Sequence, residues 1–470
     1  MSRMHVFVLL TLTACGSDLP AHEVESRPIT TGAPFELGDE GCPMAHCDPA
    51  MSDYDPIAAP VRRPRVVASD GDVHGAGVGL GCSSNGSTAV CSFGSRAGSS
   101  TGPYVVAYDS SGDRRWTSGD WLGSTAFASA PMVDVHGGAI AADAHAIIRF
   151  DEHGDPVWTN RVAGLPISPV PVDGGAVLIA TQAVIGTSFA PVLAYDSGTG
   201  ELLGCLHLGV DEDVAGEGDA CFEPTSLPGG AFATVNTPGG RGGRVYVAAQ
   251  LVAADGTSGA HPHGRLYAID VDPAAAPGQR LSRAWAFDFV GPSGASPLVI
   301  GDVVFFDGAG VAPGQDGPFF FAVRDRGDRG ELVWRYQLPR PAQASAAQDP
   351  RGGLWVFGAG DSQLIRLAEE PDAAGNAVEL QRIDVADLVR GGQPSSVMSI
   401  TGPSDDPTLL VSSRSLLRSE LLAIRLTDGT LRWRVDTGAM SFGQYPVMRD
   451  DSGAPVVAVA TTRDGVRFLR

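Results

Sequence analysis

Cysteine is the residue type with the clearest chemical role in this sequence of 470 residues. Six of the seven cysteines form three pairs that are close along the chain: Cys42 and Cys47, Cys82 and Cys91, and Cys205 and Cys221. In an oxidising compartment such pairs form disulfides, and proximity favours these three pairings. Zinc is the alternative, but none of the spacings is CxxC and no second Cys or His pair is matched to them. The sequence therefore predicts three local disulfides and no metal site.

The seventh cysteine, Cys15, lies at the end of a short export signal. Arg3 precedes an apolar run over residues 6–12, which is too short to span a bilayer, since spanning takes about 20 apolar residues. The stretch LTAC at residues 12–15 resembles the bacterial lipobox, in which the signal is cleaved before the cysteine and acyl chains are attached to it. This resemblance predicts lipid attachment at Cys15, and an ordinary signal peptide with a chance cysteine is the alternative. By the same resemblance, Gly16 in place of Asp favours the outer membrane.

Three other stretches hold residues that could bind a ligand. His261 and His263 could coordinate a metal from a Gly-rich insertion, although two histidines in such a loop are more commonly exposed to solvent. Residues 305–317 contain scattered acids without the spacing of an EF-hand calcium loop. Residues 326–328 read Arg-Gly-Asp, an adhesion tripeptide that also occurs by chance, at an expected turn. With no HExxH motif, the sequence predicts no catalytic residue and no cofactor.

The composition disfavours a nucleic-acid partner and favours an all-β fold. The formal net charge of −21 would repel a phosphate backbone. The 61 Gly and 34 Pro indicate many turns, and short alternating apolar runs recur without any long run of helical period.

The alternating runs belong to an internal repeat. Residues 104–116 (YVVAYDSSGDRRW), 147–158 (IIRFDEHGDPVW) and 421–433 (LLAIRLTDGTLRW) share an apolar strand, an acidic turn with Gly and a strand with Trp. The first two Trp residues lie 42 residues apart (158 − 116 = 42), which is the length of a four-stranded propeller blade, roughly 40–50 residues. Asp suits the turn because it bonds nearby backbone N–H groups, and Gly accepts positive φ.

Tryptophan marks the expected fourth strand of five units, at Trp116, Trp158, Trp285, Trp334 and Trp433. One blade cannot bury both of its faces, and an indole on the outer strand supplies apolar area between neighbouring blades. These five residues are therefore predicted to pack blades together. Unit six lacks this Trp, and unit three has Leu-Leu-Gly-Cys in its place.

Aligning the chain with itself predicts eight blades. Seven units begin and end near 78–118, 127–162, 167–209, 222–290, 293–340, 343–385 and 394–438, and an incomplete eighth runs over 442–470. Residues 64–80 resemble residues 432–448, so residues 62–69 are predicted to complete the last blade and close the ring. The predicted fold is an all-β, eight-bladed β-propeller of four-stranded antiparallel blades, with seven blades as the alternative.

The repeated segments, such as residues 104–116, 147–158 and 421–433, resemble the PQQ-like β-propeller repeat, and the resemblance covers nearly the whole chain after residue 60. The resemblance implies a propeller and two functional branches. Quinoprotein dehydrogenases hold PQQ and calcium at the propeller centre, typically under adjacent cysteines, but this chain has no Cys-Cys dipeptide. The second branch contains non-catalytic bacterial lipoproteins, including the propeller component of the outer-membrane β-barrel assembly machinery.

Three parts follow: a lipoprotein signal peptide at 1–14, a Pro-rich and acidic linker with a small Cys42–Cys47 loop at 15–60, and the propeller at 61–470. The predicted function is a non-catalytic protein-interaction or binding scaffold, anchored in the bacterial envelope through Cys15, with an envelope protein as partner and a monomeric ring. The alternatives are a PQQ- and calcium-dependent quinoprotein dehydrogenase and an extracellular ligand- or glycan-binding propeller.

Overall fold

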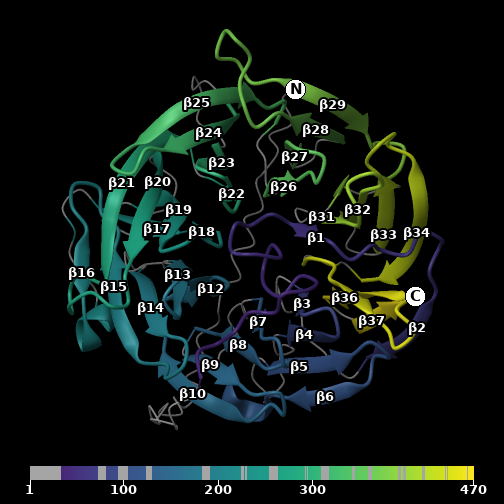
Figure 1. Ribbon diagram of the computed structural model, residues 1–470, viewed down its shortest axis with the longest axis horizontal. Coiled ribbons are helices and arrows are strands. Elements are labelled where there is room, and N and C mark those ends of the chain that lie inside the picture. Colours follow the sequence, from purple (N-terminus) through teal and green to yellow (C-terminus); the bar gives the residue numbers. More distant parts are fainter. Residues whose placement is uncertain are drawn as a thin grey trace, which may run out of the picture.

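The computed structural model is a ring of eight antiparallel sheets, three of which carry additional short strands (Figure 1). The structure describes residues 33–71, 81–93, 104–122, 130–144, 146–182, 191–223, 227, 230–234, 236–252, 263–291, 293, 295–308, 317–340, 345–357, 362–389, 393–394, 398–414, 419–439, 441, 443–462 and 464–470. The eight-bladed propeller predicted from the repeat is confirmed.

Each sheet is one blade, with its first strand at the ring axis and its fourth strand at the rim. Blade 1 is β3 (Cys82–Ser84), β4 (Thr88–Phe93), β5 (Tyr104–Asp109) and β6 (Arg114–Thr117), and blade 2 is β7 (Met132–Val133), β8 (Ala139–Ala142), β9 (Ala146–Phe150) and β10 (Pro156–Arg161). Blade 3 is β12 (Val170–Val172), β13 (Ala176–Gln182), β14 (Pro191–Asp196) and β15 (Leu202–His207), with β11 (Leu165–Pro166) and β16 (Val214–Gly216) added. Blade 4 is β18 (Gly239–Arg241), β19 (Arg244–Val252), β20 (His263–Val271) and β21 (Leu281–Val290), with β17 (Ala231–Thr234) added.

The other four blades repeat this order. Blade 5 is β22 (Leu298–Ile300), β23 (Val303–Gly308), β24 (Phe319–Asp325) and β25 (Gly330–Gln337), and blade 6 is β26 (Ala347–Gln348), β27 (Leu354–Phe357), β28 (Gln363–Leu367) and β29 (Glu379–Asp384). Blade 7 is β31 (Ser399–Thr401), β32 (Thr408–Arg414), β33 (Ser419–Arg425) and β34 (Leu431–Gly438), with β1 (Tyr54–Asp55) and β30 (Gln393–Pro394) added. Blade 8 is β35 (Val447–Arg449), β36 (Pro455–Thr461), β37 (Gly465–Leu469) and β2 (Val66–Asp70).

The ring is closed by a strand from the N-terminal side of the chain. β2 pairs antiparallel with β37 and forms the rim strand of blade 8, with Val66 opposite Leu469. Arg65 and Arg470 extend the pairing through two backbone hydrogen bonds of 2.9 and 3.0 Å. This confirms the predicted closing strand. Because β2 supplies the fourth strand of blade 8, β37 is not left as an open sheet edge.

The acidic residue of the repeat caps its own turn. Asp109 Oδ1 accepts hydrogen bonds from the backbone N–H groups of Ser111 and Asp113, and Asp151 Oδ1 accepts the equivalent pair from His153 and Asp155. These bonds satisfy donors that a tight turn would otherwise leave without partners. The acids of the turns are thus used for folding rather than for binding a ligand.

The five repeat tryptophans are all buried and lie between neighbouring blades. Each indole N–H donates a hydrogen bond to a group that follows it around the ring: Trp116 to Gly137 O, Trp158 to Ser197 O, Trp285 to Asp325 Oδ1, Trp334 to Glu369 O and Trp433 to Pro60 O. The register between the third and fourth strands shifts beside each of these positions, as a β-bulge does, which turns the indole toward the next blade.

The turn glycine of one blade rests on the tryptophan of the blade before it. A Cβ atom on Gly200 would lie 2.5 Å from Trp158, and one on Gly154 would lie 2.9 Å from Trp116. The turn glycine and the tryptophan of the repeat therefore contact each other between neighbouring blades.

Replacing Gly200 with alanine is expected to destabilise the protein by about 1–2 kcal/mol for the positive φ alone, plus about 1–3 kcal/mol for overpacking against Trp158. Gly375 is the matched control, because it occupies the same kind of turn at φ 85° with no atom near its missing Cβ. Chemical denaturation of both variants measures the difference. Equal losses at the two positions would show that the Gly200–Trp158 contact contributes nothing.

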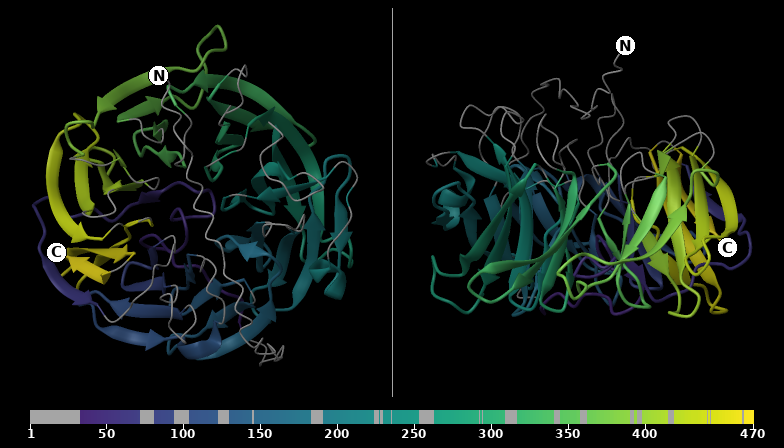
Figure 2. Two further views of the ribbon diagram at one scale, coloured as in Figure 1. Left: turned by 180° about the vertical axis from the view of Figure 1, so that it is seen from behind. Right: turned by 90° about the horizontal axis from the view of Figure 1, so that it is seen from above.

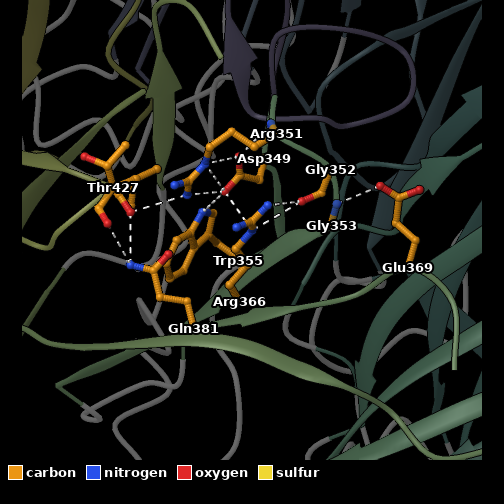
Figure 3. A network of polar contacts seen from close by, with 10 residues as sticks. Asp349, Arg351, Gly352, Gly353, Trp355, Arg366, Glu369, Gln381 and Thr427 are labelled. Atoms are coloured by element: carbon orange, nitrogen blue, oxygen red, sulfur yellow. Dashed lines mark hydrogen bonds and ion pairs between the residues drawn. The ribbon is translucent and has the colours of Figure 1, made fainter. Parts of the chain in front are cut away.

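Blade 6 replaces its tryptophan with a polar network (Figure 3). Gln381 occupies the Trp position, opposite Arg366, and its Nε2 donates to Leu426 O and Thr427 O of blade 7, as an indole N–H does elsewhere. Beside it, the buried carboxylate of Asp349 binds both Arg351 and Arg366 and accepts the indole N–H of Trp355. Hydrogen bonds and ion pairs thus hold this contact where the apolar stack is missing.

Three disulfides join Cys42 to Cys47, Cys82 to Cys91 and Cys205 to Cys221, which confirms the predicted pairing. Cys82 faces Cys91 across the β3–β4 hairpin. In blade 3, where Gly204 takes the Trp position, the disulfide from Cys205 holds the short helix η2 (Gly218–Phe222) against the rim. The only other helix in the described ranges is η1 (Gly119–Trp121), and neither is long enough to cross a membrane.

Candidate functional site

Residues 33–60, here called the axial segment, cross the middle of the ring (purple in Figure 1) and lie toward one of its faces (Figure 2). The sequence predicts a tether for residues 15–60, and the described part of that range differs from this prediction. Cys42, Met44, Cys47 and Met51 are at most 3 % exposed, so this stretch is part of the folded core.

The axial segment is hydrogen-bonded to every blade. Its oxygen atoms accept hydrogen bonds from backbone N–H groups of seven blades. In the eighth case, blade 3, the N–H of Phe35 donates to Ser197 Oγ. The accepted bonds are Ser84 to Cys42 O, Val133 to Pro43 O, Gly240 to Pro49 O, Val299 to Ala50 O, Gln348 to Ser52 O, Ile400 to Asp53 O and Val447 to Asp55 Oδ2, at 2.6–3.1 Å. Because the first strand of each blade has one open edge facing the axis, these N–H groups need acceptors, and the segment supplies them.

To reach these donors in turn, the axial segment adopts backbone conformations that are rare for residues other than glycine. His46, Cys47, Met51 and Asp53 all have positive φ, between 52° and 74°, although none is glycine. Each such residue costs about 1–2 kcal/mol, so the contacts with the blades must offset several of them. The Cys42–Cys47 disulfide closes the tightest part of the turn.

Replacing Cys42 and Cys47 together with serine is expected to lower the free energy of unfolding by about 2 kcal/mol, the value for a loop of this length in the chain-entropy model. Hydrogen exchange should also show faster exchange at His46 N–H, which bonds Gln444 Oε1 at 2.7 Å. Reducing the wild-type protein should reproduce both effects. Unchanged exchange at His46 would contradict a role of this disulfide in holding the segment on the axis.

A buried polar cluster lies where the axial segment meets blades 5 and 8. His46 Nδ1 lies 2.9 Å from Asp53 Oδ2, and His46 Nε2 lies 3.0 Å from Ser296 Oγ. Burial opposes the charged imidazolium, but the facing Asp53 carboxylate outweighs it and raises the pKa of His46. Asp53 is itself fully buried, and its Oδ1 atom has no hydrogen-bond partner among the described residues.

Asp55 is a second buried acid of the axial segment. Its carboxylate accepts the N–H groups of Ile57 at 2.8 Å and Val447 at 3.1 Å. Burial raises the pKa of Asp55 to about 7, against the smaller opposing effect of these two donors. The carboxyl of Asp55 therefore changes charge close to neutral pH.

The other predicted site residues do not gather around this cluster. Cys15 and His261 lie outside the described residues, and His263 begins β20 opposite Val290. Asp307, from the acidic stretch 305–317, is buried and accepts a hydrogen bond from Ser293 Oγ. Within the described ranges no three His, Cys, Asp or Glu residues are grouped as metal ligands.

The Arg-Gly-Asp tripeptide lies in the exposed turn between β24 and β25. Arg326 is ion-paired with Glu331 there, and the side chain of Asp328 is 81 % exposed. These contacts are those of a charged hairpin turn.

The residues on the axis do not fit a quinoprotein site. The disulfide there joins Cys42 to Cys47 rather than adjacent cysteines, and the acids are directed to the chain's own groups, Asp53 to His46 and Asp55 to backbone N–H. Met44 and Met51 of the same segment are completely buried.

No protein-family model matches this sequence, and no curated protein matches it. Among solved structures, the ring is similar to a europium-containing methanol dehydrogenase, with 15 % identity, 90 % of both chains covered and a TM-score of 0.53. It is also similar to Saccharomyces cerevisiae Sqt1, with 9 % identity, 88 % of this chain and 98 % of that one covered, and a TM-score of 0.53. BamB from Moraxella catarrhalis is 14 % identical, with 89 % and 96 % covered and a TM-score of 0.38. At such identities the likeness concerns the fold alone, a β-propeller.

Proposed function

We propose that this chain is an exported β-propeller, anchored in the cell envelope through Cys15, that acts as a scaffold for another envelope protein. The observation that carries the proposal is the axial segment. Because the chain's own residues occupy the axis and bond every blade, a partner protein would bind on the rim and the loop faces of the ring.

Export is supported by the three disulfides, which persist in oxidising compartments and are rare in the cytosol. Anchoring is supported by the lipobox-like stretch that ends at Cys15. Acyl chains contribute about 0.8 kcal/mol per buried CH₂, so two or three chains together would hold the ring firmly at a membrane.

The rim offers apolar contact points for a partner. Leu332 on β25 and Leu380 on β29 are 45 % and 49 % exposed on the outer strands of neighbouring blades. Val61, Val66 and Val67 are exposed around the closing strand of blade 8. Single exposed apolar residues are normal, so these positions serve as places for crosslinkers.

The first test is the intact mass of protein extracted from membranes of its source. A diacyl or triacyl mass on Cys15, membrane release of a Cys15→Ser variant and no uptake of PQQ with calcium are the expected results. An unlipidated mass would overturn the anchor, and stoichiometric PQQ binding with dye reduction would overturn the scaffold.

The second test concerns the partner. A photo-crosslinker at Leu332 or Leu380 is expected to give one discrete adduct in intact cells, and the same group at exposed Asp428, in the β33–β34 turn, tests whether the adduct is specific to the rim. Loss of that adduct in the Cys15→Ser variant would tie the interaction to the envelope. No adduct from any rim or loop-face position would contradict the scaffold function.

A further inference from the structure

Ser296 differs from the serines that occupy the same position in other blades. This position is two residues before the first strand. There, Ser168 Oγ accepts the N–H of Ala130 from the preceding blade, and Ser345 Oγ accepts the N–H of Ser296 in the same way. Ser296 Oγ takes no such N–H among the described bonds and instead faces His46 Nε2 at 3.0 Å.

The side chains of Ser296, His46 and Asp53 are arranged as a nucleophile, a base and a carboxylate that orients the base. The hydroxyl of Ser296 meets Nε2 of His46, and the carboxylate of Asp53 meets Nδ1 at 2.9 Å, which fixes the tautomer that leaves Nε2 free to accept a proton. We propose that Ser296, His46 and Asp53 form a hydrolytic site, with Ser296 as nucleophile, His46 as general base and Asp53 as the residue that positions His46. This activity is independent of the proposed scaffold function.

The backbone around the site is strained in the way that functional residues are. His46 and Asp53 both have positive φ, at 61° and 52°, and the backbone N–H of His46 is fixed by Gln444. Ser296 is held from the other side by Ser345. The base and the nucleophile come from elements 250 residues apart, so only the docked axial segment assembles the site.

Access and charge limit the substrate. Ser296 is 3 % exposed and the His46 side chain 10 %, so a substrate must be small to reach them. Asp48, Asp53 and Asp55 lie on the same short stretch, in a chain of net charge −21, which disfavours an anionic substrate. The substrate class that fits is a short, neutral carboxylic ester.

The reaction balances with water as the second reactant. Ser296 Oγ bonds the carbonyl carbon while its proton moves to His46 Nε2, and the alcohol leaves with that proton. Water then loses a proton to His46 and attacks the acyl group, which releases the carboxylic acid and restores the serine. Pro297 follows the nucleophile and has no N–H to stabilise the oxyanion, so the adjacent hydroxyl of Ser345 is the donor we assign to it.

The test is labelling of the full chain with a short-chain alkyl fluorophosphonate, followed by peptide mass spectrometry. One adduct is expected on Ser296, absent in Ser296→Ala and unchanged in Ser168→Ala, the matched serine of blade 3. His46→Asn, chosen because Asn tolerates positive φ, should slow labelling at least about 100-fold. Asp53→Asn should also slow it and change its dependence on pH, a readout that a purely structural role would not move.

Circular dichroism and thermal melting establish that each variant is folded before it is compared. Folded wild-type protein that gives no adduct on Ser296, under conditions that fully label a control serine hydrolase, would overturn the proposal. An adduct that forms equally fast in folded His46→Asn would overturn it as well. Slow hydrolysis of 4-nitrophenyl acetate that disappears in Ser296→Ala would support it.

Discussion

Replacing Trp158 with alanine is expected to lower the free energy of unfolding by about 3–5 kcal/mol, the usual cost of truncating a large buried aromatic side chain. Trp158 is completely buried between blades 2 and 3, where it packs with Ile140, Ile179 and Tyr195. Its loss removes the apolar stack and leaves Ser197 O without the indole N–H donor. Urea denaturation followed by circular dichroism measures the change.

Trp121 is the matched control for this experiment. It is 41 % exposed in helix η1, so its replacement by alanine is expected to change the free energy of unfolding by no more than about 0.5 kcal/mol. Similar losses for the two variants would mean that tryptophan content, rather than position between blades, sets the stability of the ring.

Raising the pH from about 5 to about 8 is expected to destabilise the fold by about 3 kcal/mol through Asp55 alone, since each pKa unit is worth about 1.4 kcal/mol. Burial raises the pKa of Asp55 to about 7 in the folded state, from 3.8 in the unfolded chain. Between these two values the folded state binds the extra proton. The stabilisation is therefore fully present below about pH 4 and is lost as the pH rises through about 7.

The variant Asp55→Asn separates this effect from other titrations. Asn keeps one acceptor but turns an NH₂ group toward the Val447 N–H, so the variant should be less stable than wild type near pH 5. Its stability should then depend less on pH, so that the two curves converge toward pH 8. Parallel curves over this range would contradict a raised pKa of Asp55.

The titration of His46 is expected to change the stability of the fold in the same direction as that of Asp55. Burial lowers its pKa, but Asp53 outweighs this and raises it above 6.5 in the folded state, so its stabilising effect is present at acid pH and is lost as the pH rises past that value. The pKa values of Asp48 and Asp53 are also raised, first of all by burial. The axial segment as a whole is thus expected to dock more firmly in mildly acidic solution.

The blades could be predicted from sequence because each repeats a local pattern. The strand, the acidic turn, the glycine and the tryptophan lie within about one blade length, and their spacing follows from contacts inside that blade or with the next. The closing strand can be predicted in the same way, because residues 64–80 resemble residues 432–448. Proximity in sequence also identified the three disulfides.

The axial segment could not be predicted by these means. Its residues are Pro-rich and acidic, without apolar periodicity, and what holds them is a set of backbone N–H groups from strands throughout the ring. Any chain with backbone carbonyl groups could accept those bonds, so the types of side chain in this segment give little indication that it docks on the axis. The buried Met44 and Met51 were the available signal, and two methionines are not a pattern.

The polar cluster and the tryptophan replacement in blade 6 escaped prediction for related reasons. His46 and Ser296 meet because the axial segment docks against blade 5, and not through any spacing in the sequence. Gln381 performs the hydrogen bonding of an indole with a side chain that shares none of its apolar character. In both cases the function of a residue depends on a partner that the sequence places far away.

The axial segment and the closing strand together set an order of assembly. Residues 33–70 are made before any blade, yet their partners include the first strand of seven blades, Ser197 of blade 3 and the last strand of the ring, β37. A growing chain therefore emerges with a segment that cannot complete its contacts until the final residues are available. The native ring should consequently be completed in a late step after synthesis, with high contact order and slow folding.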